Sequence, residues 1–105
     1  MKTYYLIVLT VALALTSNAF AADDVEALFN KSKCGACHKL DNKTVGPTLK
    51  DIAAKYAGNK DVIATLEKKV RTGGVGVWGK MPMSRTHDTV TDDEIKVLVA
   101  WMLAH

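Results

Sequence analysis

The sequence predicts a small all-α domain, and three observations support this fold class. Four segments carry apolar residues at the three- and four-residue spacing of an amphipathic helix, and no segment shows the alternation of a convincing strand. Two of these segments follow a threonine that has an acidic residue three positions later, which is typical of a helix N-cap. The chain has 105 residues, a length that suits one domain. We therefore expect four helices around a single core.

The first 21 residues have the pattern of a secretory signal peptide. Lys2 supplies a positive charge, Tyr4–Leu15 form an apolar run of 12 residues, and Ala19-Phe20-Ala21 fits the small-x-small rule of signal peptidase. A membrane anchor is the alternative, but 12 residues fall short of the roughly 20 that span a bilayer. We predict that residues 1–21 are cleaved and that residues 22–105 form the working domain.

The first two helices are predicted on either side of the cysteine pair. The first is capped by Asp23 or Asp24 and ends near Ser32. Its core-facing residues are Val25, Leu28 and Phe29. The second begins at the N-cap Thr48 and stops at Gly58. Its core-facing residues are Leu49, Ile52, Ala53 and Tyr56.

The other two helices are predicted before and after a long loop. The third begins after Asn59 and ends before Gly73, with basic residues in its last turn that suit the helix dipole. Its apolar stripe is Val62, Ile63, Leu66 and Val70. The fourth begins at Thr91, where Glu94 completes a capping box. Its apolar face is Ile95, Leu98, Val99 and Met102, with Val97 and Trp101 beside it.

The segment between these helices, residues 73–90, has an unusual composition for a loop. Eighteen residues without regular structure are uncommon in so small a domain. Four glycines accompany the apolar residues Val75, Val77, Trp78, Met81 and Met83. A solvated loop would not be this apolar, so we expect the segment to pack against a large apolar group that the glycines allow the backbone to approach.

The segment Lys33–Leu40 holds the only two cysteines of the chain and places a histidine directly after the second. A Cys-x-x-Cys-His run is the attachment motif of c-type haem. Cys34 and Cys37 can add to the two vinyl groups of one macrocycle, and His38 then lies under the iron as an imidazole ligand. The motif therefore predicts one covalently bound haem, which also gives the apolar loop a packing partner.

Other uses of the two cysteines fit the sequence less well. A thioredoxin-like dithiol follows a strand in a βαβ pattern, and the histidine would then have no role. A zinc site needs about four ligands, and the remaining histidines, His87 and His105, lack paired spacing. A disulfide between Cys34 and Cys37 would close a loop too short to stabilise the fold.

The iron would need a second axial ligand, and the residues alone leave the choice open. Met81 and Met83 both lie in the apolar loop, where a thioether could face the haem, and His87 is a further candidate. The second ring nitrogen of His38 needs an acceptor that fixes the ring orientation, and the carbonyl of Pro47 is suited to this.

In its motifs the chain resembles the class I c-type cytochromes, and more closely the small bacterial cytochromes c-551 and c-552. The matching pieces are CGACH at 34–38, VGPTLKDIAAKYAG at 45–58, GVWGKMPM at 76–83 and DDEIKVLVAWML at 92–103. They follow one another in the order of the family and cover nearly all of the predicted working domain. The resemblance implies a small cytochrome c fold, with four helices around one covalently attached haem c.

The resemblance also implies the attachment and ligand residues. It places thioether bonds at Cys34 and Cys37 and the proximal iron ligand at His38. It places the axial methionine at Met83, which ends Trp-Gly-x-x-Pro-Met, with Met81 as the fallback.

Further contacts are implied around the haem. The Pro47 carbonyl accepts from His38, the indole N–H of Trp78 donates to a haem propionate, and Lys69 is a nearby counter-charge. Phe29 and Trp101 match positions where the terminal helices cross.

One segment departs from the pattern of the family. Such proteins commonly have a proline pair and an asparagine after the ligand methionine. Here SRTHDTV (84–90) replaces them, and the segment is about two residues longer. The hydrogen bonding around Met83 and the role of His87 therefore do not carry over from the resemblance.

The function that these residues predict is electron transfer. Two filled axial positions leave no vacant site on the iron, which favours a carrier over an enzyme. We predict a periplasmic, monomeric, monohaem c-type cytochrome that shuttles single electrons between respiratory redox partners, such as a cytochrome-type reductase, oxidase or peroxidase. The alternatives are a haem-based ligand sensor or ligand-binding protein with a displaceable Met ligand, and a periplasmic thiol oxidoreductase.

The charge of the chain gives weaker indications about partners. The formal net charge is only +3, and removing residues 1–21 takes away Lys2 alone, so binding to nucleic acid is not expected. Stable membrane insertion is not expected after cleavage. Lysines near the motif and the ligand loop could form a basic rim that steers an acidic partner, or could be ordinary solvated lysines. They are Lys31, Lys33, Lys39, Lys43 and Lys80.

Overall fold

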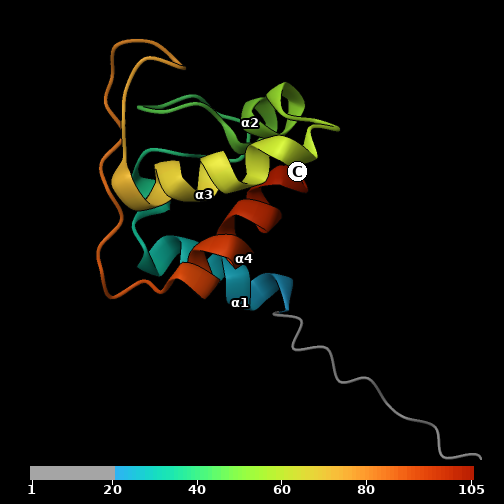
Figure 1. Ribbon diagram of the computed structural model, residues 1–105, viewed down its shortest axis with the longest axis vertical. Helices are drawn as coiled ribbons and strands as arrows, with labels where there is room; N and C mark the ends of the chain where they lie inside the picture. The colour runs from blue at the N-terminus through green and yellow to red at the C-terminus, as the bar shows by residue number, and fades with distance from the viewer. Residues whose placement is uncertain (1–20) are drawn as a thin grey trace, which may run out of the picture.

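The computed structural model describes residues 21–105, and within them the chain has four α-helices and no strand, as predicted (Figure 1). The helices are α1 (Ala22–Lys31), α2 (Leu49–Lys55), α3 (Ile63–Thr72) and α4 (Asp92–Leu103). Two 3₁₀ turns, η1 (Cys34–Ala36) and η2 (Lys60–Val62), lie between them. The predicted signal peptide, apart from Ala21, lies outside the described residues. No helix in the described part of the chain is long and apolar enough to cross a bilayer.

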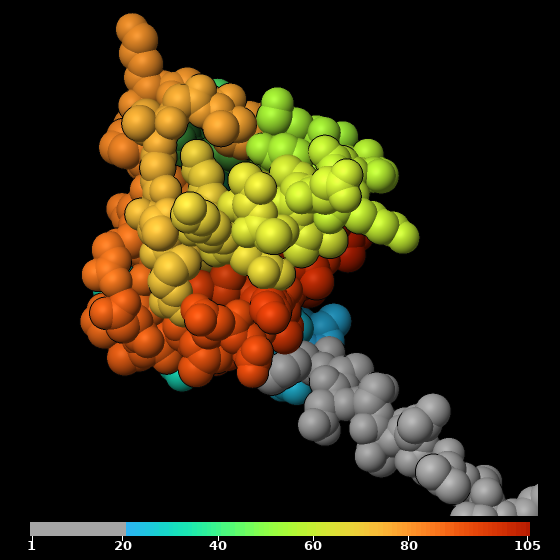
Figure 2. Space-filling view, viewed as in Figure 1, coloured from blue at the N-terminus to red at the C-terminus, as the bar shows by residue number. Residues whose placement is uncertain are grey.

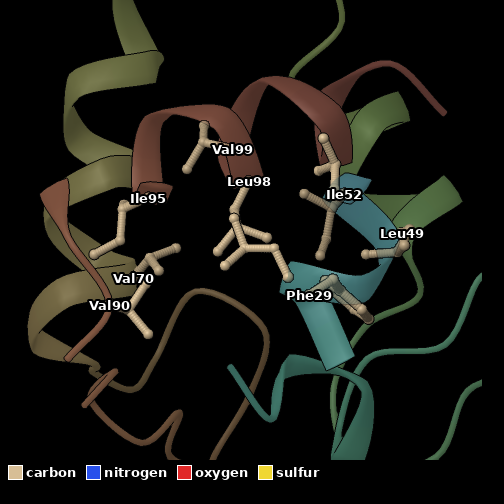
Figure 3. Packing of buried hydrophobic residues seen from close by; sticks show 10 residues of the cluster. Phe29, Leu49, Ile52, Val70, Val90, Ile95, Leu98 and Val99 are labelled. Carbon is tan, nitrogen blue, oxygen red and sulfur yellow. The ribbon is translucent and has the colours of Figure 1, made fainter. Parts of the chain in front are cut away.

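Helix α4 is the centre of the fold, because it packs against each of the other three helices. Its inward face carries Ile95, Leu98 and Val99, and the last two are fully buried. Figure 3 shows these side chains pointing from α4 toward Phe29 of α1 and Val70 of α3. The predicted face of the fourth helix is therefore the face that forms the core.

Local capping fixes where α4 and α2 begin. The hydroxyl of Thr91 accepts from the amide of Glu94 at 3.1 Å, and the Glu94 carboxylate accepts from the amide of Thr91 at 3.0 Å. This is the complete capping box that the sequence predicts. In α2, the hydroxyl of Thr48 accepts from the amide of Asp51 at 3.0 Å.

Helix α1 is correctly predicted in extent but not in its cap. Its N-cap is Ala21, and no side chain caps the helix. Asp23 and Asp24 lie inside the first turn instead, where their negative charges favour the positive end of the helix dipole. The helix ends at Lys31, and the ring of Phe29 packs against Trp101 of α4 with centroids 5.2 Å apart, as the resemblance implies.

Helix α3 is preceded by the turn η2, which the sequence pattern did not separate from it. Because η2 ends at Val62, that residue does not belong to the same helix as the rest of the predicted stripe. Ile63, the first residue of α3, is 38% exposed and does not join the core as predicted. Val70, near the other end of the stripe, is buried.

The long loop rises from the end of α3, turns back and descends to the start of α4 (Figure 1). Residues 73–90 contain no helix or strand, as predicted. Gly74 and Met83 nevertheless exchange two backbone hydrogen bonds, of 3.0 and 2.7 Å, and so join the rising and the descending arm at their base. The chain leaves α3 at Gly73, whose φ of +72° is readily adopted only by glycine.

Candidate functional site

A cavity of about 860 Å³ lies between the long loop, η1 and the chain around Gly46. This volume falls in the range of roughly 300–1,000 Å³ that is typical of small-molecule and cofactor sites. In Figure 2 the molecule is hollowed between the loop, in orange, and α2, in green. Every residue that the sequence predicts to bind haem or iron lies in the wall of this cavity.

The cysteine motif reaches the cavity through the turn η1. The amides of Cys37 and His38 both donate to the carbonyl of Cys34, at 3.2 and 3.0 Å, which curls the chain so that all three residues line the cavity. The two cysteines are free thiols and are half-buried. Burial raises the pKa of the Cys34 thiol above its ordinary value, whereas catalytic dithiols have a lowered pKa.

His38 is held in one orientation. Its ring is buried, and Nδ1 donates to the carbonyl oxygen of Pro47 at 2.8 Å, the bond that the sequence predicts. Because a carbonyl can only accept, the proton of a neutral ring sits on Nδ1 and leaves a lone pair on Nε2. Gly46 packs on the ring so closely that a Cβ there would lie 2.8 Å from Cε1 and 3.0 Å from Nδ1.

The two candidate methionines differ in their surroundings. Both line the large cavity, but Met81 is 65% exposed, whereas Met83 is half-buried and packs against the core. Met83 and His38 also line a smaller, wholly apolar cavity of about 60 Å³ at the core. Of the two, only Met83 therefore lines both cavities together with His38.

Trp78 and Lys69 line the cavity from different elements. Trp78 lies in the loop and is 43% exposed, with the Nζ of Lys55 from α2 lying 5.3 Å from its ring centroid. Lys69, in the last turn of α3, is half-buried and lies close to Gly74, where a Cβ would be 3.3 Å from its Nζ. An indole N–H and an ammonium group are thus available on the same cavity wall.

His87 lies on the cavity wall but is exposed. Its Nδ1 accepts from the backbone amide of Thr89 at 3.1 Å and lies 3.0 Å from the hydroxyl of the same residue. Its imidazole is therefore engaged in a local turn.

Exposed basic residues contribute to the wall of the cavity. Four of the five lysines predicted to form a rim line the cavity, namely Lys31, Lys33, Lys43 and Lys80. Lys39 does not line it. Exposed apolar side chains lie among them, namely Val45, Val75, Val77 and Met81.

Three residues near the site were not identified from the sequence. The buried hydroxyl of Ser32 lines the cavity and has no hydrogen-bond partner within residues 21–105. Thr86 and Arg71 connect the descending arm of the loop to α3. No motif marks any of them, because their contacts join residues far apart in the chain or face the cavity itself.

The donor set fits a covalently attached haem. Two half-buried thiols, one imidazole with a free Nε2 and one thioether meet in a mainly apolar cavity of suitable size. The unpartnered hydroxyl of Ser32 provides a further polar group on the wall. A cluster of three or more His, Cys, Asp or Glu side chains that could hold a metal ion by itself is not present in the described part of the chain.

Comparison with known proteins agrees with this chemistry. The cytochrome c family model matches residues 22–105. Cytochrome c-551 from Pseudomonas aeruginosa is 41% identical over 104 residues, which are 99% of this chain and 98% of that protein. Cytochrome c-552 from Nitrosomonas europaea is 44% identical over 92 residues, 88% of this chain and 87% of that protein.

Solved structures give the same result for the fold. The crystal structure of wild-type Nitrosomonas europaea cytochrome c552 superimposes with a TM-score of 0.69 at 44% identity, covering 75% of this chain and 96% of that chain. The resemblance and the small cytochrome c fold predicted from the motifs are thereby confirmed. The chain belongs to the cytochrome c family, as a small c-type cytochrome of electron transfer that carries covalently attached haem c.

Proposed function

We propose that this chain is exported to the periplasm and, as a monomer, shuttles single electrons between respiratory redox partners through a haem with His38 and Met83 as axial ligands. The observation that carries the proposal is that these two side chains line both the large cavity and the small one at the core, His38 with its Nε2 lone pair free and Met83 packed against the core. Haem c, when bound, supplies a one-electron iron couple.

Cys34 and Cys37 are the proposed attachment residues. Both thiols are free and half-buried on the cavity wall, where they can reach one macrocycle. The raised pKa of Cys34 argues against the alternative of a thiol oxidoreductase, which needs a readily formed thiolate.

The chain contributes rigidity to the ligands. The bond from His38 to Pro47 fixes the imidazole, and the paired hydrogen bonds between Gly74 and Met83 fix the backbone of the methionine. Ligands held in this way move little when the charge at the site changes, so little has to reorganise during electron transfer. Thioether ligation in an apolar pocket also raises the reduction potential relative to ligation by two imidazoles.

Trp78 and Lys69 are the proposed partners of the haem carboxylates. The indole N–H can donate to a carboxylate, and the ammonium of Lys69 can offset its charge. The side chain of Lys55, over the face of Trp78, stabilises the position of the indole ring through a cation–π contact.

The redox partner is proposed to be acidic at its contact surface. The wall of the cavity includes Lys31, Lys33, Lys43 and Lys80 among exposed apolar side chains. A basic rim accelerates encounter with an acidic protein, and a small apolar centre suits a brief complex. This surface is the proposed exit for electrons.

A matched pair of variants tests the axial ligand. A haem-matured Met83→Ala protein should lose the weak far-red band that reports an iron–sulfur bond in the oxidised state. Its reduced form should bind added carbon monoxide. Met81→Ala should keep the band and resist carbon monoxide, because Met81 is largely exposed.

The opposite pattern would move the ligand to Met81. Prompt carbon monoxide binding by the unmodified reduced protein would instead support the ligand-binding or sensor function. A pigment removed by acid–acetone extraction would contradict covalent attachment at Cys34 and Cys37.

The N-terminus of the exported protein tests the proposed export and cleavage. We expect the N-terminus of protein recovered from the periplasm of a haem-maturing host to be Ala22. A periplasmic product that keeps residues 1–21 would contradict cleavage.

A further inference from the structure

The descending arm of the loop, residues 83–90, carries the proposed axial ligand but has no regular structure to hold it. Met83 is its first residue, and α4 begins only at Asp92. The paired bonds with Gly74 secure the arm at Met83 itself. The residues that follow need separate attachments, because a free arm would let the methionine swing away from the cavity.

We propose that Thr86 and Arg71 are positioning residues that keep Met83 directed at the haem iron by fastening the descending arm to the end of α3. This inference rests on the proposed function, since it takes Met83 as the axial ligand. Thr86, in the descending arm, and Arg71, in α3, both lie outside the four family motifs.

The first attachment is made by Thr86, which is only 6% exposed. Its hydroxyl donates to the carbonyl oxygen of Val70 at 2.7 Å, and its amide donates to the same oxygen at 3.2 Å. Carbonyls in the last turn of a helix lack amide partners from their own helix. The amide that would serve Val70 in a longer helix, that of Gly74, donates to Met83 instead. Thr86 therefore donates its hydrogen bonds to a carbonyl that has no amide partner within α3.

The second attachment is made by Arg71, the residue after Val70. Its Nη2 donates to the carbonyl of Val90 at 2.6 Å and to Oδ1 of Asp92 at 2.9 Å. Its Nε also reaches the same carboxylate oxygen, at 3.2 Å, and its Nη1 lies 3.4 Å from the carbonyl of His87. One guanidinium thus holds the far end of the arm and the first turn of α4.

Together these contacts limit how far Met83 can move. Thr86 is three residues beyond Met83, so the chain between them spans at most about 10 Å even when fully extended. This short stretch is tied at Met83 to Gly74, two residues beyond α3, and at Thr86 to Val70 within α3. Releasing Thr86 leaves only one of the two ties in place.

Imidazole is a suitable probe, because it binds the oxidised iron only in molecules whose methionine has left. Its apparent Kd equals the intrinsic Kd divided by the fraction of open molecules. Thr86→Val removes the hydroxyl donor, and we expect the open fraction to rise and the apparent Kd to fall by about tenfold, the effect of losing one buried hydrogen bond. The titration is followed by loss of the far-red band, and Thr86→Ser, which keeps the donor, should restore the unmodified Kd.

Two control variants separate positioning from general loss of stability. Thr72→Val makes the same change in the last turn of α3, where the hydroxyl donates to the carbonyl oxygen of Lys68 at 2.9 Å and lies 3.3 Å from that of Gly73, and so makes no contact with the descending arm. It should leave the apparent Kd unchanged. Arg71→Gln should lower the Kd, whereas Arg85→Gln, which removes a pair with Asp88 inside the arm, should not. If Thr86→Val fails to fold, Arg71→Gln and its control Arg85→Gln still test the proposal.

The outcomes distinguish this inference from the function on which it rests. If Thr86→Val and Arg71→Gln both had the same apparent Kd for imidazole as the unmodified protein, the positioning role would be overturned and Met83 would remain the ligand. An equal fall in Kd for the control variants would also overturn it. Absence of the far-red band in the unmodified oxidised protein would overturn the ligand assignment itself, and the positioning role with it.

Discussion

Lys33 has a left-handed backbone conformation, with φ of +64° and ψ of +15°, directly before the first cysteine. It is the only non-glycine residue with positive φ in the described part of the chain. A Cβ in this conformation is crowded by its own backbone, at a cost of roughly 1–2 kcal/mol. Lys33, the residue directly before the turn η1 that carries the two thiols, is therefore strained.

Replacing Lys33 with glycine should relieve this strain. We expect Lys33→Gly to raise the free energy of unfolding by about 0.5–1 kcal/mol, since the added flexibility of the unfolded chain offsets part of the gain. Denaturant unfolding of the haem-bound protein measures this. Lys43→Gly is the matched control, an exposed lysine without positive φ, and should be neutral or destabilising. Equal effects of the two changes would show that Lys33 is not strained.

At the scale of residues, the sequence predicted what lies close together along the chain. The bond from His38 to Pro47 was expected because the residues are nine apart and the motif demands an acceptor. The contacts of Arg71 and Thr86 were not, because they join residues 16 to 21 positions apart. No local pattern distinguishes these two side chains from solvated ones.

At the scale of elements, the end of α3 sets the course of the whole loop. A Cβ at Gly73 would overlap the carbonyl oxygen of Met83 and lie 2.8 Å from the amide nitrogen of Arg85. The positive φ of Gly73 and this close approach make glycine necessary there. The return of the descending arm depends on it.

A pair of glycine substitutions compares a crowded position with an open one. Gly58 has φ of +74°, close to the +72° of Gly73, but a Cβ at Gly58 would meet nothing within 4 Å. Gly58→Ala should therefore cost about 1 kcal/mol from backbone strain alone. Gly73→Ala should cost a further 1–3 kcal/mol and should weaken the far-red band, because its ψ of −167° lies in a region that is essentially restricted to glycine and its Cβ would overlap the returning arm. Equal losses in thermal unfolding would contradict the contact between the arms.

The capping box of α4 gives a prediction about pH. The backbone amide of Thr91 donates a hydrogen bond to the Glu94 carboxylate. This bond holds the pKa of Glu94 below its ordinary value, and the positive charge of Lys31 makes a smaller contribution in the same direction. A lowered pKa in the folded state stabilises the fold at neutral pH, and this stabilisation is lost over the pH range below the ordinary glutamate pKa of about 4.3.

We expect the stability difference between the unmodified protein and Glu94→Gln to shrink over this range, as measured by thermal unfolding at each pH. Thr91→Ala should cost about 1 kcal/mol at neutral pH, as is usual for loss of an N-cap. A stability difference that does not depend on pH would contradict the role of the Glu94 charge.

The element predictions succeeded where the signal was local and failed where it was not. The starts of α2 and α4 were found because Thr48 and Thr91 cap through residues three positions away. The cap of α1 was assigned wrongly, since acidic residues are favoured both at the N-cap and in the first turn. Ile63 was placed in the core because it lies seven residues before Val70 on one face of α3, but the pattern does not reveal how much of that face the rest of the fold covers.

At the scale of the whole molecule, the basic rim predicts a dependence on salt. Oxidation of the reduced protein by ferricyanide, an anion, should slow as ionic strength rises from about 0.01 to 0.15 M, because the screening length falls from about 30 to 8 Å. Replacing both Lys43 and Lys80 with glutamine should lower the low-salt rate and flatten this dependence. Lys60→Gln, away from the cavity, should do neither.

A rate that is independent of salt in the unmodified protein would remove the steering role of the rim. Stopped-flow mixing at several ionic strengths supplies the measurement, and the same series with the Lys60 variant shows the effect of losing one positive charge away from the cavity.

The position of α4 has a consequence for how the protein matures. This helix alone contacts the other three, and it follows them all along the chain. A polypeptide that emerges from the N-terminus onward presents Cys34 and Cys37 well before α4 can close the core over α1 and α2. During that interval the thiols belong to an open chain, so we expect haem attachment at these proposed sites to be possible before folding is complete.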